Sequence, residues 1–234
     1  MGSSLGSSVW DRADKGGQNT MSLGVYVAAV CGFTVYGLVV SGILAWFTMS
    51  WHPESIWPVL IIGLGIPIIG IFITLKSNNW FVSLLGYTMV VVGLGIITGP
   101  TVAMHQTGVV ITALMATMGV TLVTSIIGIM VPKSLESWGI YLFGALLALV
   151  FVRFGQAVMA AIGVSESIWY MPYIEYGAAI LFSLYIIYDW NRAVRLPHTM
   201  DNAVDCALAI YLDVINLFIT LLRIMGNKGS SSDD

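Results

Sequence analysis

The sequence predicts an all-α integral membrane protein, built as a bundle of seven transmembrane helices. Of its 234 residues, 58% are hydrophobic and only 9% are charged, whereas soluble domains carry about 25% charged residues. The apolar residues are grouped in long stretches, and a helix needs about 20 of them to cross a bilayer. The formal net charge of −3 is spread over few groups and provides no basic surface for nucleic acid.

Seven apolar stretches predict the individual helices, and the short connectors between them predict an antiparallel, up-and-down order. The stretches are 23–47, 56–75, 80–98, 107–131, 138–163, 168–188 and 206–225. The connectors leave no room for a second domain, so we expect one membrane domain over 23–226. Residues 1–22 are expected to form a disordered cytoplasmic tail, and residues 227–234 a short polar C-terminal tail.

Lysine and arginine residues predict the orientation, because cytoplasmic loops are enriched in them. They occur in the N-terminal tail and after the second, fourth and sixth stretches, at Arg12, Lys15, Lys76, Lys133, Arg192 and Arg195. The connectors after the first, third and fifth stretches have none. This alternation predicts a cytoplasmic N-terminus. The side of the C-terminus stays open, because Arg223 and Lys228 follow the middle of the last stretch.

Two aspartates in the last two stretches are the candidate functional residues. Asp189 closes the segment LFSLYIIYDW (181–190), and Asp213 lies in the middle of LAIYLDVINLFITLLRIMG (208–226). A carboxylate in hydrocarbon is costly, so it is rare unless it is paired, hydrated or functional. The predicted topology places both aspartates in the cytoplasmic half of the membrane, on helices joined by one connector.

If these two carboxyl groups meet, the pair is suited to sensing pH. Like-charge repulsion and loss of hydration favour one shared proton. The protonated pair would join two helices through a hydrogen bond, whereas the deprotonated pair would repel and offer oxygen ligands to a hard cation such as Ca²⁺. The alternative is a purely structural polar contact between helices.

Three other charged residues lie within apolar stretches. Arg153 is in the fifth stretch and Glu175 is in the outer half of the sixth. The two either form a structural salt bridge or line a water-filled pore. Arg223, beyond Asp213 in the last stretch, either extends toward the interface or neutralises an acid.

The C-terminal part resembles the Bax-inhibitor family (transmembrane Bax inhibitor motif proteins). The residues that carry the resemblance are SLYIIYD (183–189) and ALAIYLDVINLFITLLRIMG (207–226). Gly99-Pro100 after the third stretch and Thr112-Ala113 in the fourth are weaker matches. The resemblance covers 23–226, and the short loops and tails favour a bacterial member in the inner membrane, with an organellar membrane as the alternative.

The resemblance implies a bundle whose C-terminal helix is central, and a pH-sensitive calcium leak through the bilayer. Asp189 and Asp213 would form the gate and would be the ligands of Ca²⁺, with no other cofactor. The family's basic latch at the end of the second helix corresponds to Lys76, and its arginine after the Asn-Leu-Phe run corresponds to Arg223. The bacterial branch pairs that arginine with a glutamate in the second helix, which this chain lacks, so Glu175 becomes a candidate partner.

Two other functions are weighed against the leak. Intramembrane aspartyl proteases also place Tyr-Asp in one helix and Asp in the next, but here the second site reads IYLD (210–213) instead of Gly-x-Gly-Asp. No Pro-Ala-Leu turn follows, so we expect no enzyme activity. The remaining alternative is a non-conducting regulator that binds and restrains a membrane protease, or a cell-death or stress factor.

Overall fold

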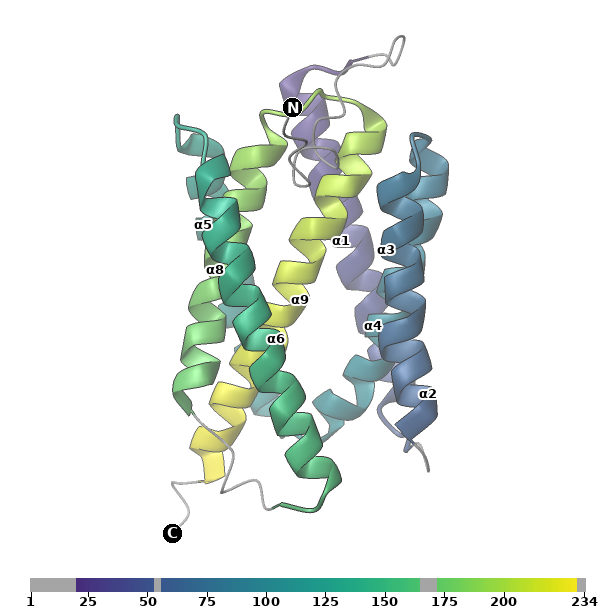
Figure 1. Cartoon of the computed structure of the whole chain (residues 1–234), viewed down its shortest axis with the longest axis vertical. Helices are drawn as coiled ribbons and strands as arrows, with labels where there is room; N and C mark the ends of the chain where they lie inside the picture. Colours follow the sequence, from purple (N-terminus) through teal and green to yellow (C-terminus); the bar gives the residue numbers. More distant parts are fainter. Residues whose placement is uncertain (1–19, 53–55, 165–171, 231–234) are drawn as a thin grey trace, which may run out of the picture. The chain divides into compact units, whose positions relative to one another are not determined.

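The computed structural model describes residues 20–52, 56–164 and 172–230, and these residues form helices joined by short turns (Figure 1). No strand occurs among them. Six of the described helices are long and apolar enough to cross a membrane: Leu23–Thr48, Trp57–Lys76, Trp80–Ala103, Thr107–Met130, Glu136–Met159 and Met200–Asn227. The prediction of an all-α integral membrane protein is therefore confirmed.

The sixth predicted stretch corresponds to α8 (Pro172–Ala193), which is not one of those six helices. Its tyrosines, together with Glu175, Asp189 and Arg192, lower its hydropathy. With 22 residues it is about 33 Å long, which is enough for a hydrocarbon core about 30 Å thick. A seventh crossing and a central C-terminal helix thus stay predictions, and residues 168–171 lie outside the described part.

The chain divides into two compact units, which are described separately. The first comprises residues 1–101 and 193–211. It holds α1 (Leu23–Thr48), α2 (Ile56–Leu60), the π-helical turn η1 (Ile61–Gly65), α3 (Ile66–Lys76), most of α4 (Trp80–Ala103) and the start of α9 (Met200–Ser230). The second comprises residues 102–192 and 212–234, and holds α5 (Thr107–Met130), η2 (Glu136–Trp138), α6 (Gly139–Ala161), α8 and the rest of α9.

Three helix boundaries differ from the prediction near the candidate residues. Helix α8 continues to Ala193, so Asp189 lies inside the helix and does not close it. Helix α9 begins at Met200, where the Thr199 hydroxyl accepts the Asn202 N–H at 3.2 Å and caps the first turn. It also runs to Ser230, into the expected C-terminal tail. An apolar stretch ends at the first polar residues, whereas the helical hydrogen bonds continue through those residues into the membrane–water interface.

The second predicted span is interrupted in front of Pro67. A proline inside a helix lacks the N–H donor, and its ring clashes with the carbonyl group four residues earlier. The π-helical turn η1 ends at Gly65, two residues before this proline, and widens the helix where the ring needs space. Across from it, Gly93 of α4 lies against the Pro67 ring, and a Cβ atom there would collide with it.

The Gly99-Pro100 pair lies inside α4, not after it as predicted. Pro100 has no N–H to donate to the carbonyl of Ile96. The Thr48 hydroxyl at the end of α1 donates to that carbonyl instead, at 3.0 Å. Gly99 makes the approach possible, because a Cβ atom at this position would collide with Thr48. The dipeptide therefore allows α1 and α4 to pack closely together.

The first part of α9 contributes Tyr211 to the core of the first unit. Its hydroxyl group lies 2.6 Å from Ser41 Oγ of α1, and Ser41 donates to the carbonyl of Val91 at 3.3 Å. The Tyr211 ring packs edge-to-face on Tyr87, with ring centroids 5.6 Å apart. These contacts join α9 to both α1 and α4 within this unit.

Candidate functional site

Helix α8 is fixed against α5 in the second unit by Asn191, a residue that the sequence analysis did not single out. Its side-chain amide donates to the carbonyls of Val131 at 3.0 Å and Lys133 at 3.2 Å, and to that of Gly128 at 3.2 Å. Its amide oxygen accepts the Leu135 N–H at 3.0 Å. Asn191 is only 1% exposed. It therefore holds the carbonyl end of α5, which needs donors, and sets the position of α8.

Helix α8 also packs on α6 through an apolar cluster. Leu142 of α6 lies with Leu181 and Tyr188 of α8 in one buried core cluster. The Tyr188 hydroxyl approaches the backbone of Gly139 so closely that a Cβ atom there would lie 2.7 Å from it. Contacts on both sides thus fix the segment that carries Asp189.

The carboxyl groups of Asp189 on α8 and Asp213 on α9 lie within hydrogen-bonding reach of each other. Asp213 is only 8% exposed, and Asp189 is half-buried. Asp213 Oδ2 is buried and accepts no hydrogen bond from an N–H or hydroxyl donor of the described residues. Two carboxylates have no proton to share, so this contact is a hydrogen bond only when one of them is protonated.

Two other groups of α8, Tyr185 and Arg192, interact with the pair. Tyr185 interacts electrostatically with both aspartates, and its ring packs edge-to-face on Tyr188 at 6.5 Å between centroids. Arg192 attracts Asp189 electrostatically and donates to the Tyr188 hydroxyl at 3.1 Å. The basic group next to Asp189 in this unit is therefore Arg192, at the next turn of the same helix, which the sequence analysis used only for topology.

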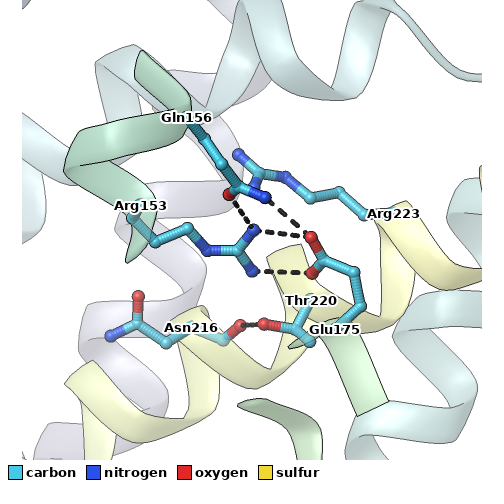
Figure 2. A network of polar contacts seen from close by, with 6 residues as sticks. All are labelled: Arg153, Gln156, Glu175, Asn216, Thr220 and Arg223. Atoms are coloured by element: carbon cyan, nitrogen blue, oxygen red, sulfur yellow. Dashed lines mark hydrogen bonds and ion pairs between the residues drawn. The ribbon is translucent and has the colours of Figure 1, made fainter. Parts of the chain in front are cut away.

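The other charged residues of the second unit form a separate cluster around Glu175 (Figure 2). Arg153 of α6 binds both carboxylate oxygens, from Nη1 at 2.5 Å and from Nη2 at 2.7 Å. Nη1 of Arg223, on α9, lies 3.9 Å from the same carboxylate. The Glu175 side chain is only 2% exposed, against 26% for Arg153 and 42% for Arg223. Arg153 and Glu175 thus form an ion pair, and a role in lining a pore stays a prediction.

Asn216 and Thr220 lie on α9 between the two clusters, and their side chains bond to their own helix. The Asn216 amide donates to the Leu212 carbonyl at 2.7 Å, and the Thr220 hydroxyl donates to the Asn216 carbonyl at 2.8 Å (Figure 2). Polar side chains satisfied in this way are tolerated in apolar helices.

Lys76, the expected latch, is the last residue of α3 and is exposed. It belongs to the first unit, whereas Asp189 belongs to the second, and its role stays a prediction. The same unit contains an acid that sequence analysis missed. Asp201, in the first turn of α9, is 4% exposed and accepts a hydrogen bond from Ser83 Oγ at 2.7 Å. An aspartate in the first turn of a helix reads as a capping residue, so its burial gave no signal in the sequence.

Comparison with known proteins identifies the family of the chain. A family model described as "Inhibitor of apoptosis-promoting Bax1" matches residues 21–230, which is nearly the whole described part. The chain belongs to the Bax-inhibitor family. The resemblance expected from the last two apolar stretches is thereby confirmed over the full membrane domain.

Relatives of this Bax-inhibitor protein occur in bacteria and plants. It is 26% identical over 235 residues to the inner membrane protein YbhL of Escherichia coli K12, which covers 93% of this chain and 97% of that one. It is 37% identical over 89 residues to LIFEGUARD 3 of Arabidopsis thaliana, covering 37% of this chain and 33% of the plant protein. An uncharacterised protein of Helicobacter pylori J99 is 32% identical over 146 residues, or 62% of this chain and 58% of that one.

Proposed function

We propose that this protein is a pH-sensitive, calcium-permeable leak through the membrane, gated by Asp189 and Asp213. The observation that carries the proposal is the contact between these two carboxyl groups on neighbouring apolar helices. With one proton between them, they join α8 to α9. Without it, two negative charges repel in a medium that screens them poorly, and the two helices separate there.

The chemistry of the pair suits a passing cation better than a resident one. Ca²⁺ takes six to eight oxygen ligands at a stable site. The described residues contain no group of three or more His, Cys, Asp or Glu side chains that could hold a metal ion. Two carboxylates attract Ca²⁺ but bind it weakly without further ligands, as conduction requires. Ca²⁺ is therefore proposed as the transported ion, and no other cofactor is proposed.

The orientation and location are proposed from the sequence and from the E. coli relative. The distribution of Lys and Arg favours a cytoplasmic N-terminus, which places the aspartate pair in the cytoplasmic half of the membrane. The name of the E. coli protein places that relative in the inner membrane, and we propose the same location here. We also propose that the protein is not an enzyme.

Calcium flux from proteoliposomes tests the proposal. The wild-type protein is expected to release Ca²⁺ at a rate that rises as pH rises and the shared proton is lost. Asp213→Asn removes one charge and keeps a hydrogen-bonding side chain, so its flux should not change with pH. Asp201→Asn is the matched control, because it changes a buried aspartate of the same helix that lies in the other unit, and its pH profile should follow wild type. If the calcium flux of Asp213→Asn depends on pH as that of the wild type does, the proposal is wrong.

The second candidate is a non-conducting regulator that restrains a membrane protease, or a cell-death or stress factor. The description of the matching family as an inhibitor of Bax1 favours it. Purified protein in liposomes separates the two functions, since a regulator without a partner gives no calcium flux at any pH.

A further inference from the structure

The Glu175 cluster joins three helices of the second unit through one buried carboxylate. Arg153 comes from α6, Glu175 from α8 and Arg223 from α9. Figure 2 shows the two arginines approaching the carboxylate from different sides. The paired fork of Arg153 fixes the geometry as well as the charge. Breaking such a pair leaves an uncompensated charge in a buried site, which is strongly unfavourable.

Helices α8 and α9 are therefore connected at two separate points. Asp189 meets Asp213, and Glu175 meets Arg223. The earlier residue of α8, Glu175, contacts the later residue of α9, Arg223, and the later residue of α8, Asp189, contacts the earlier residue of α9, Asp213. The two helices are therefore antiparallel here. The two points are about 20 Å apart along α8, at 1.5 Å per residue. One point joins two like charges and the other joins opposite charges.

The two connections differ in the groups that make them. The aspartate pair depends on one proton, and Tyr185 and Arg192 of α8 interact with it electrostatically. Arg192 also donates to the Tyr188 hydroxyl. Glu175 faces two arginines, with Gln156 as a neutral neighbour that accepts a hydrogen bond from Arg153 at 3.1 Å. Arginine stays protonated at every relevant pH. Loss of the shared proton therefore weakens only one of the two connections.

We propose that the Arg153–Glu175–Arg223 cluster is a fixed clamp, and that α8 pivots about it when the aspartate pair separates. The proposal rests on the proposed pH response of Asp189 and Asp213, but not on which ion passes. The clamp keeps α6, α8 and α9 together at one end of the unit, so that opening is confined to the other end. Glu175 is accordingly a positioning residue for the gate and not part of it.

Hydrogen–deuterium exchange of the full chain in nanodiscs tests the clamp. Wild type and Asp213→Asn are compared at the same high pH, so that the chemical exchange rate is matched. Wild type should exchange faster around 186–193 and 210–215, and at the same rate as Asp213→Asn around 172–178 and 219–226. Glu175→Gln should raise exchange in those last two segments by about tenfold, because local opening sets amide exchange. Glu136→Gln, a change of an exposed acid in the same unit, should leave them unchanged.

Two results would overturn the clamp. One is a difference between wild type and Asp213→Asn that extends equally to 172–178 and 219–226. The other is unchanged exchange of those segments in Glu175→Gln. Arg153→Lys keeps the charge and loses the fork, so it should give a smaller increase than Glu175→Gln if the variant is folded. If this exchange pattern is observed but no calcium flux is detected, the leak is rejected and the clamp is supported. If pH-dependent flux is detected without this exchange pattern, the leak is supported and the clamp is rejected.

Discussion

Asp189 and Asp213 come from two different helices, and their carboxyl groups meet at a point where Asp213 is almost completely buried. This contact differs from an ion pair, since it exists as a bond only while a proton is present. The Glu175 cluster has the opposite character, because its arginines keep their charge. The second unit thus holds one connection between two like groups, which needs a proton, and one between opposite charges.

The first prediction concerns thermal stability as a function of pH. The hydrogen bond between the two aspartates is complete at low pH and is lost as pH rises through deprotonation of the pair, so wild-type melting temperature should fall over that range. In Asp213→Asn the repulsion is absent and this part of the fall should disappear. Differential scanning fluorimetry in detergent measures both. Parallel curves for the two proteins would contradict a shared proton.

The second prediction concerns the ion pair of Glu175. Removing one partner of a buried pair costs roughly 3–5 kcal/mol, and the partial exposure of both arginines places Glu175→Gln at or below the lower end, near 2–3 kcal/mol. Glu136→Gln, at an exposed position, should cost less than about 0.5 kcal/mol. Unfolding in mixed micelles with increasing denaturing detergent gives the two free energies. Equal costs would show that the cluster contributes nothing.

The third prediction concerns Thr48 and Pro100. Thr48→Val removes the hydroxyl that donates to the Ile96 carbonyl and should cost about 1–2 kcal/mol. In a Pro100→Ala background the new backbone N–H can bond to that carbonyl, so Thr48→Val should cost less there. A double-mutant cycle on unfolding free energy measures the coupling. Additive effects would mean that the two residues act independently.

The fourth prediction contrasts two glycines. A Cβ atom at Gly86 would collide with the Gly70 carbonyl and with the Thr74 hydroxyl, so Gly86→Ala should destabilise by about 1–3 kcal/mol. At Gly144 of α6 nothing lies within 4 Å of the added atom, and alanine there should stabilise by about 0.5–1 kcal/mol. The two melting temperatures should move in opposite directions. An unchanged or raised melting temperature in Gly86→Ala would show that α3 and α4 are not packed as described.

The fifth prediction concerns Asn191, whose side chain serves three carbonyls and one N–H. Asn191→Leu loses all of these bonds and should destabilise by about 2–4 kcal/mol. Asn191→Asp keeps the acceptor for the Leu135 N–H but loses the donors, so it should also be destabilising. If Asn191→Leu melts like wild type, Asn191 does not position α8.

Much of the fold could be predicted from the sequence, because bilayer thickness makes long apolar stretches readable. The same reasoning placed the helix ends at 188 and 206 by hydropathy, whereas α8 and α9 continue through polar residues to Ala193 and from Met200. It also could not show that Gly99-Pro100 lies inside a helix, because the compensating donor, Thr48, comes from a distant part of the chain.

The candidate site was only partly predictable. Asp189, Asp213, Arg153, Glu175 and Arg223 stood out because charge is rare in apolar sequence. Which charges meet depends on helix packing, and periodicity within one helix does not determine it. Asn191 and Arg192 looked like ordinary residues at a helix end, and their roles came from contacts with α5 and with Tyr188.

Infrared spectroscopy of the carboxyl groups during a pH titration in membranes tests the shared proton most directly. Wild type should show one protonated carboxyl signal that is lost as pH rises, over the same pH range in which calcium flux appears. Asp189→Asn and Asp213→Asn should each remove that transition, whereas Asp201→Asn should keep it. Gating by a shared proton would be contradicted if the signal were lost outside the pH range of the flux. It would also be contradicted if the transition persisted in both variants.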